Sequence, residues 1–315
     1  MSGYDDNIPD PNEYLINIQG HQFANAAELL RSYSGWNASD FQNFQTWMKQ
    51  TFAENAIIFL EKRVGTHYWA NWDLAALTSL LSVGILCDDK ALVDYAINYT
   101  ANGAGMGSAA HATTATHSDD SGETLAQCQE SGRDQGHSTL DVSLLGVLCQ
   151  TAANAGAGDL FTSYNALEMA EYVAKYNLKD AEGNFVYSTI PFTSYTNGEY
   201  SHDAISADGR GSERNCWELF HAYAKKNSKA DKYTEAWVKY FRQKNAYGEG
   251  EASTLDELGF GTLMFGAEVS STDGIQTLKV QQDKEDGVFY NLQGQRVDNP
   301  TKGLYIVNGK KVVMK

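Results

Sequence analysis

The sequence predicts a mainly α protein, an (α/α) toroid, with a small C-terminal antiparallel β unit. Three observations lead to this fold class. From about residue 12 to 266, apolar residues recur at helical spacing. The helical stretches alternate between amphipathic ones and ones that are apolar nearly all round. Beyond Ser270, apolar and polar residues alternate between glycine-centred turns, as in short antiparallel strands.

The first two helices are expected at 13–33 and 37–63, where apolar residues follow one helix face. The stretch 72–87, WDLAALTSLLSVGILC, is apolar nearly all round and is therefore expected to be a buried helix. Further helices are expected at 90–100, 138–156, 163–177, 213–227 and 232–244. Pairs of helices in which one member is buried are typical of a toroid, and a globular helical bundle is the alternative.

These patterns divide the chain into a helical domain, 12–268, and a small β-rich module, 273–315. Two long stretches inside the helical domain, 102–136 and 180–212, are non-helical and rich in turn residues. Loops of this length inside a compact domain usually carry function.

Composition excludes several classes of function. The chain has 315 residues, is 42% apolar and carries a formal charge of −16. Its acidity excludes nucleic acid as a partner and opposes any polyanion, unless positive charge is concentrated locally. Four cysteines without a C-x-x-C spacing indicate no metal site, and nothing indicates a cofactor. No apolar stretch is long enough for a membrane span, and the acidic N-terminal segment is not a signal peptide.

Three polar clusters stand at the starts of predicted helices. GTHYWANWD, 65–73, leads into the buried helix at 72–87, and ESGRDQGH, 130–137, leads into the next buried helix. SADGRGSERNCWEL, 206–219, has the same relation to a third helix and contributes Arg210 and Arg214. In a toroid such starts lie at one end, so we expect the three clusters to meet.

Each cluster also has a purely structural interpretation. Asn71 or Asp73 would cap a helix beneath packed aromatic rings. Arg133 would pair with Glu130 or Asp134, and His137 would cap the helix. In the functional interpretation, Arg133 and His137 lie four residues apart and share one face of a helix.

Several long strings resemble a known family. ANAAELLRSYSGW, NWDLAALTSLLSVGILCDD, QCQESGRDQGHSTLDVSLLG, GDLFTSYNALEMAEYVAKYNL and GRGSERNCWEL cover about residues 24 to 219, and LDELGFGTLMF extends the likeness to 265. They resemble the alginate-lyase-like polysaccharide lyases with an α/α-toroid domain, a group that includes glucuronan lyases. Family members usually have a further helical region before ANAAELLR, where this chain has only about 20 residues. The resemblance therefore implies a toroid that is truncated at its N-terminus.

The resemblance implies an enzyme that cleaves a uronic-acid polymer, alginate or glucuronan, by β-elimination without a cofactor. It implies that Asn71, with Arg133, offsets the substrate carboxylate, and that His137 is the base, with His67 and His202 as rivals. Tyr172 is the expected acid, and Tyr176, Tyr68 and Tyr195 are alternatives. The expected substrate-binding residues are Tyr68, Trp69, Gln127, Glu130, Lys175, Arg210 and Arg214.

Two rival functions remain at this point. A non-catalytic uronan-binding protein or lyase remnant fits the short N-terminal region. A glycoside hydrolase would need a pair of carboxylates, for which Glu130, Asp134, Asp141 and Glu218 are available. The tail, YNLQGQRVDNPTKGLYIVNGKKVVMK, resembles secretion or sorting modules of extracellular bacterial proteins, which implies a secreted, periplasmic or cell-surface location.

Overall fold

The computed structural model describes residues 17–62, 68–197, 200–252 and 254–268 of the helical region. In the tail it describes 289–290, 296–297, 301–307 and 310–314. The chain divides into two compact units, Met1–Glu268 and Val269–Lys315. The predicted mainly α class with a small antiparallel β unit is confirmed.

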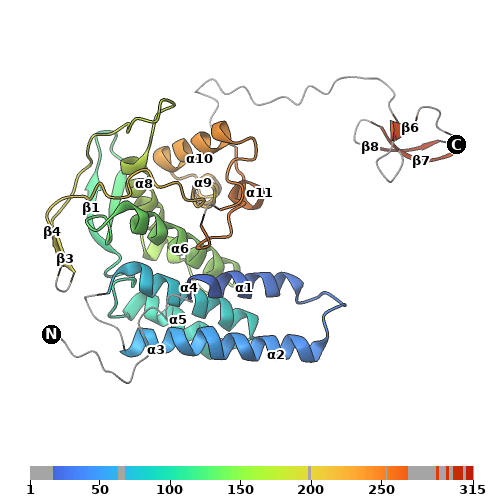
Figure 1. Ribbon diagram of the computed structural model, residues 1–315, viewed down its shortest axis with the longest axis horizontal. Helices are drawn as coiled ribbons and strands as arrows, with labels where there is room; N and C mark the ends of the chain where they lie inside the picture. Colours follow the sequence, from blue (N-terminus) through green and yellow to red (C-terminus); the bar gives the residue numbers. More distant parts are fainter. Residues whose placement is uncertain are drawn as a thin grey trace. The chain divides into compact units, whose positions relative to one another are not determined.

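The first unit is built from helices that follow one another along the chain (Figure 1). They are α1 (Asn17–Leu30), α2 (Ala38–Met48), the π-helix η2 (Lys49–Ala53), α3 (Glu54–Lys62), α4 (Ala70–Leu86), α5 (Lys90–Asn102), α6 (Gln135–Asn154), α7 (Leu160–Ser163), α8 (Ala166–Asn177), α9 (Trp217–Lys226), α10 (Lys232–Lys244) and α11 (Gly261–Phe265).

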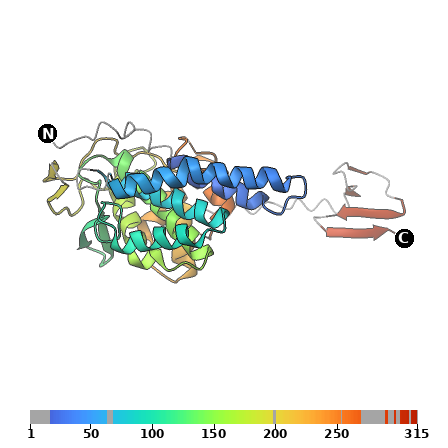
Figure 2. The same ribbon diagram turned by 90° about the horizontal axis from the view of Figure 1, so that it is seen from below.

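Two of these helices, α4 and α6, form the centre of the first unit, because nearly all of α4 and most of α6 are buried. α4 packs on α1, α3, α5 and α6, and α6 packs in turn on α8. α8 continues the series to α9 and α10. The segment from α2 through η2 to α3 runs as one long helix along the side of this unit (Figure 2). Alternation of apolar and amphipathic stretches therefore predicts the buried helices correctly.

Two hairpins lie in the stretches expected to be non-helical. β1 (Thr113–Ser118) pairs antiparallel with β2 (Thr124–Cys128), and β3 (Tyr195–Asn197) pairs antiparallel with β4 (Tyr200–His202). The alternation in β1 and β2 is too short to predict strands, but β-branched threonines favour them.

The second unit contains a four-stranded antiparallel sheet in the order β6-β5-β7-β8. Its strands are β5 (Phe289–Tyr290), β6 (Arg296–Val297), β7 (Gly303–Val307) and β8 (Lys310–Met314).

The glycine-rich segment at 103–108 packs against the start of α4. The N–H of Gly107 donates to the buried carboxylate of Asp73 at 2.8 Å. A Cβ on Gly105 or Gly107 would lie 2.2 or 2.5 Å from atoms of that side chain, so only glycine fits there. Burial raises the pKa of Asp73 to about 7.

Candidate active site

The segment that precedes α6 also caps the start of α4. The N–H of Asn71 donates to Oε1 of Glu130 at 2.9 Å, and the N–H of Ala70 donates to Oε1 of Gln129 at 3.0 Å. The first N–H groups of a helix have no partner within the helix, and its positive end favours a carboxylate. This capping brings the first two polar clusters together, as the sequence predicts for the starts of neighbouring helices.

Arg133 lies between the two clusters. Its Nη1 donates to Oε2 of Glu130 at 2.9 Å, and its Nε lies 3.6 Å from Oδ2 of Asp134. The guanidinium also stands over the ring of Trp69, 5.0 Å from the ring centre. The side chain remains partly exposed, so the guanidinium both joins the two helix starts and faces solvent.

Asp134 and His137 form a hydrogen-bonded pair at the start of α6. Oδ1 of Asp134 accepts the backbone N–H of His137 at 2.8 Å, which makes Asp134 the N-cap. Oδ2 lies 2.6 Å from Nδ1 of the same histidine. Burial opposes ionisation of Asp134, but the bonds from His137 outweigh it and lower the pKa of the carboxyl. The carboxylate holds the proton on Nδ1, so Nε2 is left as the basic nitrogen.

Arg133 precedes α6, so it does not share a helix face with His137 as expected from their spacing. Residues 130–133 form turns instead, and the two side chains approach each other through Asp134.

An aromatic platform borders this pair. The ring of Trp69 stacks on that of Tyr200 with 5.5 Å between centres, and it lies 5.3 Å from the ring of His202. Tyr200 is exposed, and the rings come from the N-cap of α4 and from the β3–β4 hairpin. Flat exposed rings of this kind are suited to stacking on a sugar.

Tyr195 lies beside the same platform. Its hydroxyl donates to the carbonyl oxygen of Gln129 and accepts the N–H of Gly132 at 3.1 Å. Its ring centre is 5.3 Å from that of His202. A Cβ on Gly132 would lie 2.4 Å from the Cβ of His202, so this close approach needs glycine. Burial raises the pKa of Tyr195, so the hydroxyl keeps its proton at neutral pH.

Buried carboxyls lie behind Arg133. Glu130 is fully buried, and burial raises its pKa against the attraction of Arg133. Burial, and then the charge of Glu130, raise the pKa of Asp141 well above its usual range, and Sγ of Cys128 lies 3.2 Å from its Oδ2. Burial and the neighbouring carboxyl of Glu130 therefore favour the protonated form of Asp141, against the opposing charge of Arg133. The side-chain Oδ1 of Asn71 is buried and has no hydrogen-bond partner among the described residues.

The structure does not bring Tyr172 to this site. Its side chain is fully buried, and its hydroxyl donates to the carbonyl oxygen of Pro191 at 3.0 Å. An acid must reach the leaving oxygen of a substrate. Tyr195, which the sequence offers only as an alternative, occupies the better position.

Lys175 is also used elsewhere. Its Nζ lies 3.0 Å from Oδ2 of Asp119, and it stands over the rings of Tyr187 and Tyr233. Both charged side chains are nearly buried, so this ion pair holds the turn that follows β1 against α8.

Arg210 and Arg214 use their donors inside the fold. Nε of Arg210 donates to the carbonyl oxygen of Tyr176 at 2.8 Å. Nη1 of Arg214 lies 3.0 Å from Oδ2 of Asp256 and 2.5 Å from Oε2 of Glu257, in a buried ion pair. The backbone at 206–209 does contact the second cluster, since the N–H of Gln135 donates to the carbonyl oxygen at position 208. The third cluster thus reaches the site with its backbone, and its two arginines do not.

Two further predicted substrate-binding residues are structural. The amide of Gln127 donates to Thr114 and to the carbonyl oxygen of Thr193, and its oxygen accepts the N–H of Thr193 at 2.8 Å. Tyr68 is buried against Phe59, with 5.3 Å between ring centres. From the predicted substrate-binding set, Trp69 therefore lies at the site, and Glu130 lies behind it as the buried partner of Arg133. His67 lies outside the described residues.

The sequence names Asp134 only as a structural partner of Arg133 or as a carboxylate of the hydrolase alternative, and it does not point to Tyr200. The spacing Asp-x-x-His at a helix start was available as a signal for Asp134, because an N-cap carboxylate lies next to the side chain three residues later. Tyr200 had no such signal, since a hairpin far along the chain carries it to Trp69.

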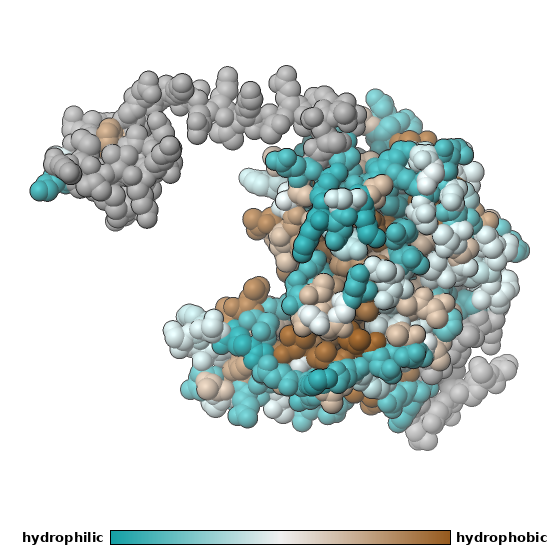
Figure 3. All heavy atoms as spheres, turned by 180° about the vertical axis from the view of Figure 1, so that it is seen from behind, coloured by the Kyte–Doolittle hydropathy of each residue, from teal (hydrophilic) through white to brown (hydrophobic). Residues whose placement is uncertain are grey.

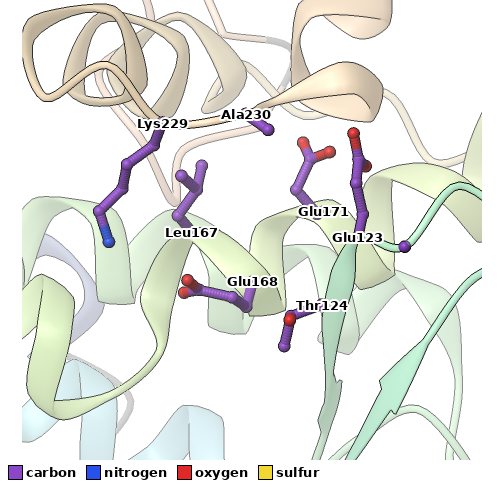
Figure 4. A pocket seen from close by; sticks show the side chains of 8 residues that line it. Glu123, Thr124, Leu167, Glu168, Glu171, Lys229 and Ala230 are labelled. Atoms are coloured by element: carbon purple, nitrogen blue, oxygen red, sulfur yellow. The ribbon is translucent and has the colours of Figure 1, made fainter.

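An acidic pocket of about 290 Å³ lies between the β1–β2 hairpin, α8 and residues 229–230 (Figure 4). Glu123, Glu168 and Glu171 line it together with Lys229, and Figure 4 shows the carboxyls of Glu123 and Glu171 side by side. Glu171 accepts the N–H groups at the start of α10, and burial raises its pKa to about 8. The sign of its charge makes this pocket unsuited to an anionic sugar.

Within the described ranges, no group of three or more histidine, cysteine, aspartate or glutamate side chains is arranged to hold a metal ion. In the same part of the chain, every helix is too short or too polar to cross a membrane.

The model of the family described as alginate lyase matches residues 12–182, which include Asn71, Arg133, Asp134 and His137. No curated protein and no solved structure matches the chain. Since the match covers more than half of the sequence, this chain belongs to the alginate lyase family, a family of polysaccharide lyases.

Proposed function

We propose that the protein cleaves a uronic-acid polymer, of the alginate or glucuronan type, by β-elimination at the site around Arg133 and His137. The observation that carries this proposal is the Asp134–His137 pair, 2.6 Å apart, in which the partly exposed histidine and the guanidinium of Arg133 approach the same carboxylate oxygen. Elimination needs a base at a carbon acid and a positive charge near the adjacent carboxylate, and these two side chains are neighbours here.

His137 is the base in this reaction. Its Nε2 takes the proton from C5 of the uronate, and the electron pair left behind is delocalised into the adjacent carboxylate as an enolate. The C4=C5 double bond forms as the bond between C4 and O4 breaks, and the electrons of that bond leave on O4. Asp134 stabilises the imidazolium that results, as a carboxylate does in other acid–base pairs. His202 is the weaker rival, because burial lowers its pKa and its Nε2 is buried.

Tyr195 is the acid that protonates O4. A tyrosine hydroxyl is neutral at pH 7 and donates one proton. Burial favours the protonated hydroxyl, and the ring, which is less buried than that of Tyr172, lies beside His202 of the Trp69 platform. The hydroxyl donates to the carbonyl oxygen of Gln129 in the free protein, so it turns from that oxygen to O4 when substrate binds. The proton gained by O4 and the proton lost from C5 balance the reaction, which consumes no water.

Arg133 and the side-chain amide of Asn71 offset the uronate carboxylate. A guanidinium has five N–H donors, and Nη1 and Nε of Arg133 make the contacts to Glu130 and Asp134. The remaining N–H groups of Arg133 are available to bind the substrate carboxylate. Offsetting the charge of that carboxylate lowers the free energy of the enolate that develops as the C5 proton leaves. Because Lys175, Arg210 and Arg214 are engaged elsewhere, Arg133 supplies most of the positive charge at this site.

Incubation of the purified protein with alginate, glucuronan and pectate tests the reaction type. A lyase produces a C4=C5 double bond, so absorbance in the ultraviolet rises on at least one uronan. New reducing ends without that absorbance would indicate a glycoside hydrolase instead. Binding to a uronan without either signal would indicate a non-catalytic binding protein, and it would contradict the proposal.

A secreted, periplasmic or cell-surface location is part of the same proposal. A polymeric substrate is too large to enter a cell intact, and the residues from 273 to 315 include a separate small sheet that fits a sorting-type module.

A further inference from the structure

The aromatic platform at the candidate active site presents one ring to solvent. The guanidinium of Arg133 lies 5.0 Å from the centre of the Trp69 indole, and the imidazole of His202 lies 5.3 Å from it. Tyr200 stacks on the same indole at 5.5 Å between ring centres, yet this residue is 51% exposed. The indole is therefore crowded by its neighbours, and the ring that is free to stack on a sugar is that of Tyr200.

The hairpin that carries Tyr200 is anchored through its other strand. Tyr200 pairs in register with Asn197, which is buried, and Nδ2 of Asn197 donates to the carbonyl oxygen of Tyr68 at 3.3 Å. The hydroxyl of Tyr195, on the same strand as Asn197, accepts the N–H of Gly132 at 3.1 Å. These bonds tie the hairpin to the residues that directly precede the indole and the guanidinium. A ring that is held in place before the ligand arrives loses little conformational entropy on binding.

The charges around the platform favour a sugar without a carboxylate. In the proposed function, Arg133 binds the carboxylate of the uronate that is cleaved. Asp203 follows His202 in the chain, is exposed, and acts on that imidazole with its negative charge. Burial lowers the pKa of His202, so the imidazole itself is uncharged at neutral pH. A sugar that lies on Tyr200 therefore meets an aromatic surface beside a negative charge, which repels a second carboxylate.

The platform differs in this respect from other exposed apolar surface of the molecule. On the face drawn in Figure 3, apolar side chains gather in a hollow between polar borders. Apolar contact alone is non-directional and selects no particular ligand. The platform combines a flat exposed ring with a guanidinium and a carboxylate, and these neighbours define the chemistry of what lies on the ring.

We propose that Tyr200 forms a subsite for an uncharged sugar next to the uronate that is cleaved. This inference rests on the proposed lyase function and narrows it. The protein recognises one carboxylate for each cleaved bond, through Arg133, and it recognises a neighbouring sugar by stacking. Arg133 and Tyr200 contact the same indole, so both can act on one short stretch of a sugar chain. Uronans in which neutral sugars stand beside uronates are then substrates as well.

Partial carboxyl reduction of a uronan that the protein cleaves tests the subsite. Carbodiimide activation followed by borohydride converts some uronates into neutral sugars at random along the chain. After digestion, mass spectrometry of the fragments identifies the two sugars that flanked each cleaved uronate. We expect neutral sugars in at least one of these two positions about as often as in the polymer. Uronates alone in both positions would overturn the proposal.

Tyr200→Ala and Tyr200→Phe test the ring itself. Alanine removes the stacking surface, so kcat/KM on the partly reduced polymer should fall about tenfold, mainly through KM. Phenylalanine keeps the ring and should restore the wild-type value. Tyr247→Ala is the matched control, because Tyr247 is 80% exposed and lies in the turn after α10, outside the site. Equal values of kcat/KM in Tyr200→Ala and Tyr247→Ala would contradict the assignment.

Calorimetric titration with partly reduced glucuronan separates this inference from the proposed function. Weaker binding by Tyr200→Ala than by the wild-type protein supports the subsite even if no C4=C5 double bond forms, and in that case only the lyase function fails. Double-bond formation with the same affinity and the same kcat/KM in both proteins would leave the lyase function standing and overturn the subsite. The absence of binding by the wild-type protein would also overturn it.

Discussion

The Nδ1 atom of His137 lies 2.6 Å from Oδ2 of Asp134, and Oδ1 of the same carboxylate accepts the backbone N–H of His137. One side chain therefore both starts α6 and orients the imidazole. The position of the candidate base is fixed by the geometry of a helix N-terminus, which is among the most reproducible local structures in proteins.

Asp134→Asn separates these two tasks. Asparagine caps a helix as well as aspartate does, but it lacks the charge that favours the imidazolium. We expect kcat to fall by at least about tenfold, with little change in thermal stability. The control is Asp159→Asn, since Asp159 caps α7 away from the site by accepting the N–H of Thr162. An unchanged kcat in Asp134→Asn would show that His137 does not depend on this carboxylate.

Tyr195→Phe and Tyr172→Phe distinguish the two candidate acids. Tyr195→Phe should lower kcat by about 10²- to 10⁴-fold, because it removes the proton donor. Tyr172→Phe removes the buried bonds of that hydroxyl to the carbonyl oxygen of Pro191 and to Ser131, which should cost about 1 kcal/mol of unfolding free energy each and leave kcat unchanged. Steady-state kinetics and chemical denaturation measure both effects. The opposite pattern would return the role to Tyr172.

Arg133→Lys tests whether the guanidinium binds substrate. Lysine keeps the charge beside Glu130 but loses the planar fork that suits a carboxylate, so kcat/KM should fall about tenfold. Arg214→Lys is the matched control. Arg214 sits in a buried ion pair with Glu257, so its replacement should reduce stability and leave kcat/KM of the folded protein unchanged. An equal fall in kcat/KM for both variants would show that the effect of Arg133→Lys does not come from lost substrate binding.

Stability should depend on pH through Glu171. Burial raises the pKa of this carboxyl from about 4.5 to about 8 in the folded protein, so the unfolded chain gives up its proton first. The stabilising contribution of Glu171 to the free energy of unfolding is therefore fully present below about pH 4.5. It is lost as the pH rises towards 8, and the loss is on the order of a few kcal/mol. Glu171→Gln should flatten this part of the curve of unfolding free energy against pH.

Glu168→Gln is the control for this measurement, because Glu168 lies on the same helix and lines the same pocket but is less buried. Denaturation at several pH values compares the three proteins. A curve that rises between pH 5 and 8 in the wild-type protein but not in Glu171→Gln would contradict the assignment.

The buried helices are predictable because a helix that is buried on all sides has apolar residues on all its faces, and this pattern is visible in the sequence. The segment 72–87 is apolar nearly all round, and it forms α4, Ala70–Leu86. The meeting of the first two polar clusters follows from the same logic, because the starts of neighbouring buried helices lie close together and share capping side chains.

The partners of individual charges are not predictable in this way. Arg214 pairs with Glu257, and Lys175 pairs with Asp119, each more than forty residues away along the chain. Nothing local to either residue indicates which carboxylate will neutralise it. Tyr200 reaches Trp69 through a hairpin whose strands are only three residues long, too short for a period-two pattern to stand out.

The rate at which the C4=C5 double bond forms, compared between the wild-type protein and His137→Ala on the same uronan, tests the central claim most directly. The account predicts a clear rise in ultraviolet absorbance with the wild-type protein and a rate at least about a hundredfold lower in the variant, with the fold intact. Equal rates in the two proteins would contradict the assignment of His137 as the base that removes the C5 proton.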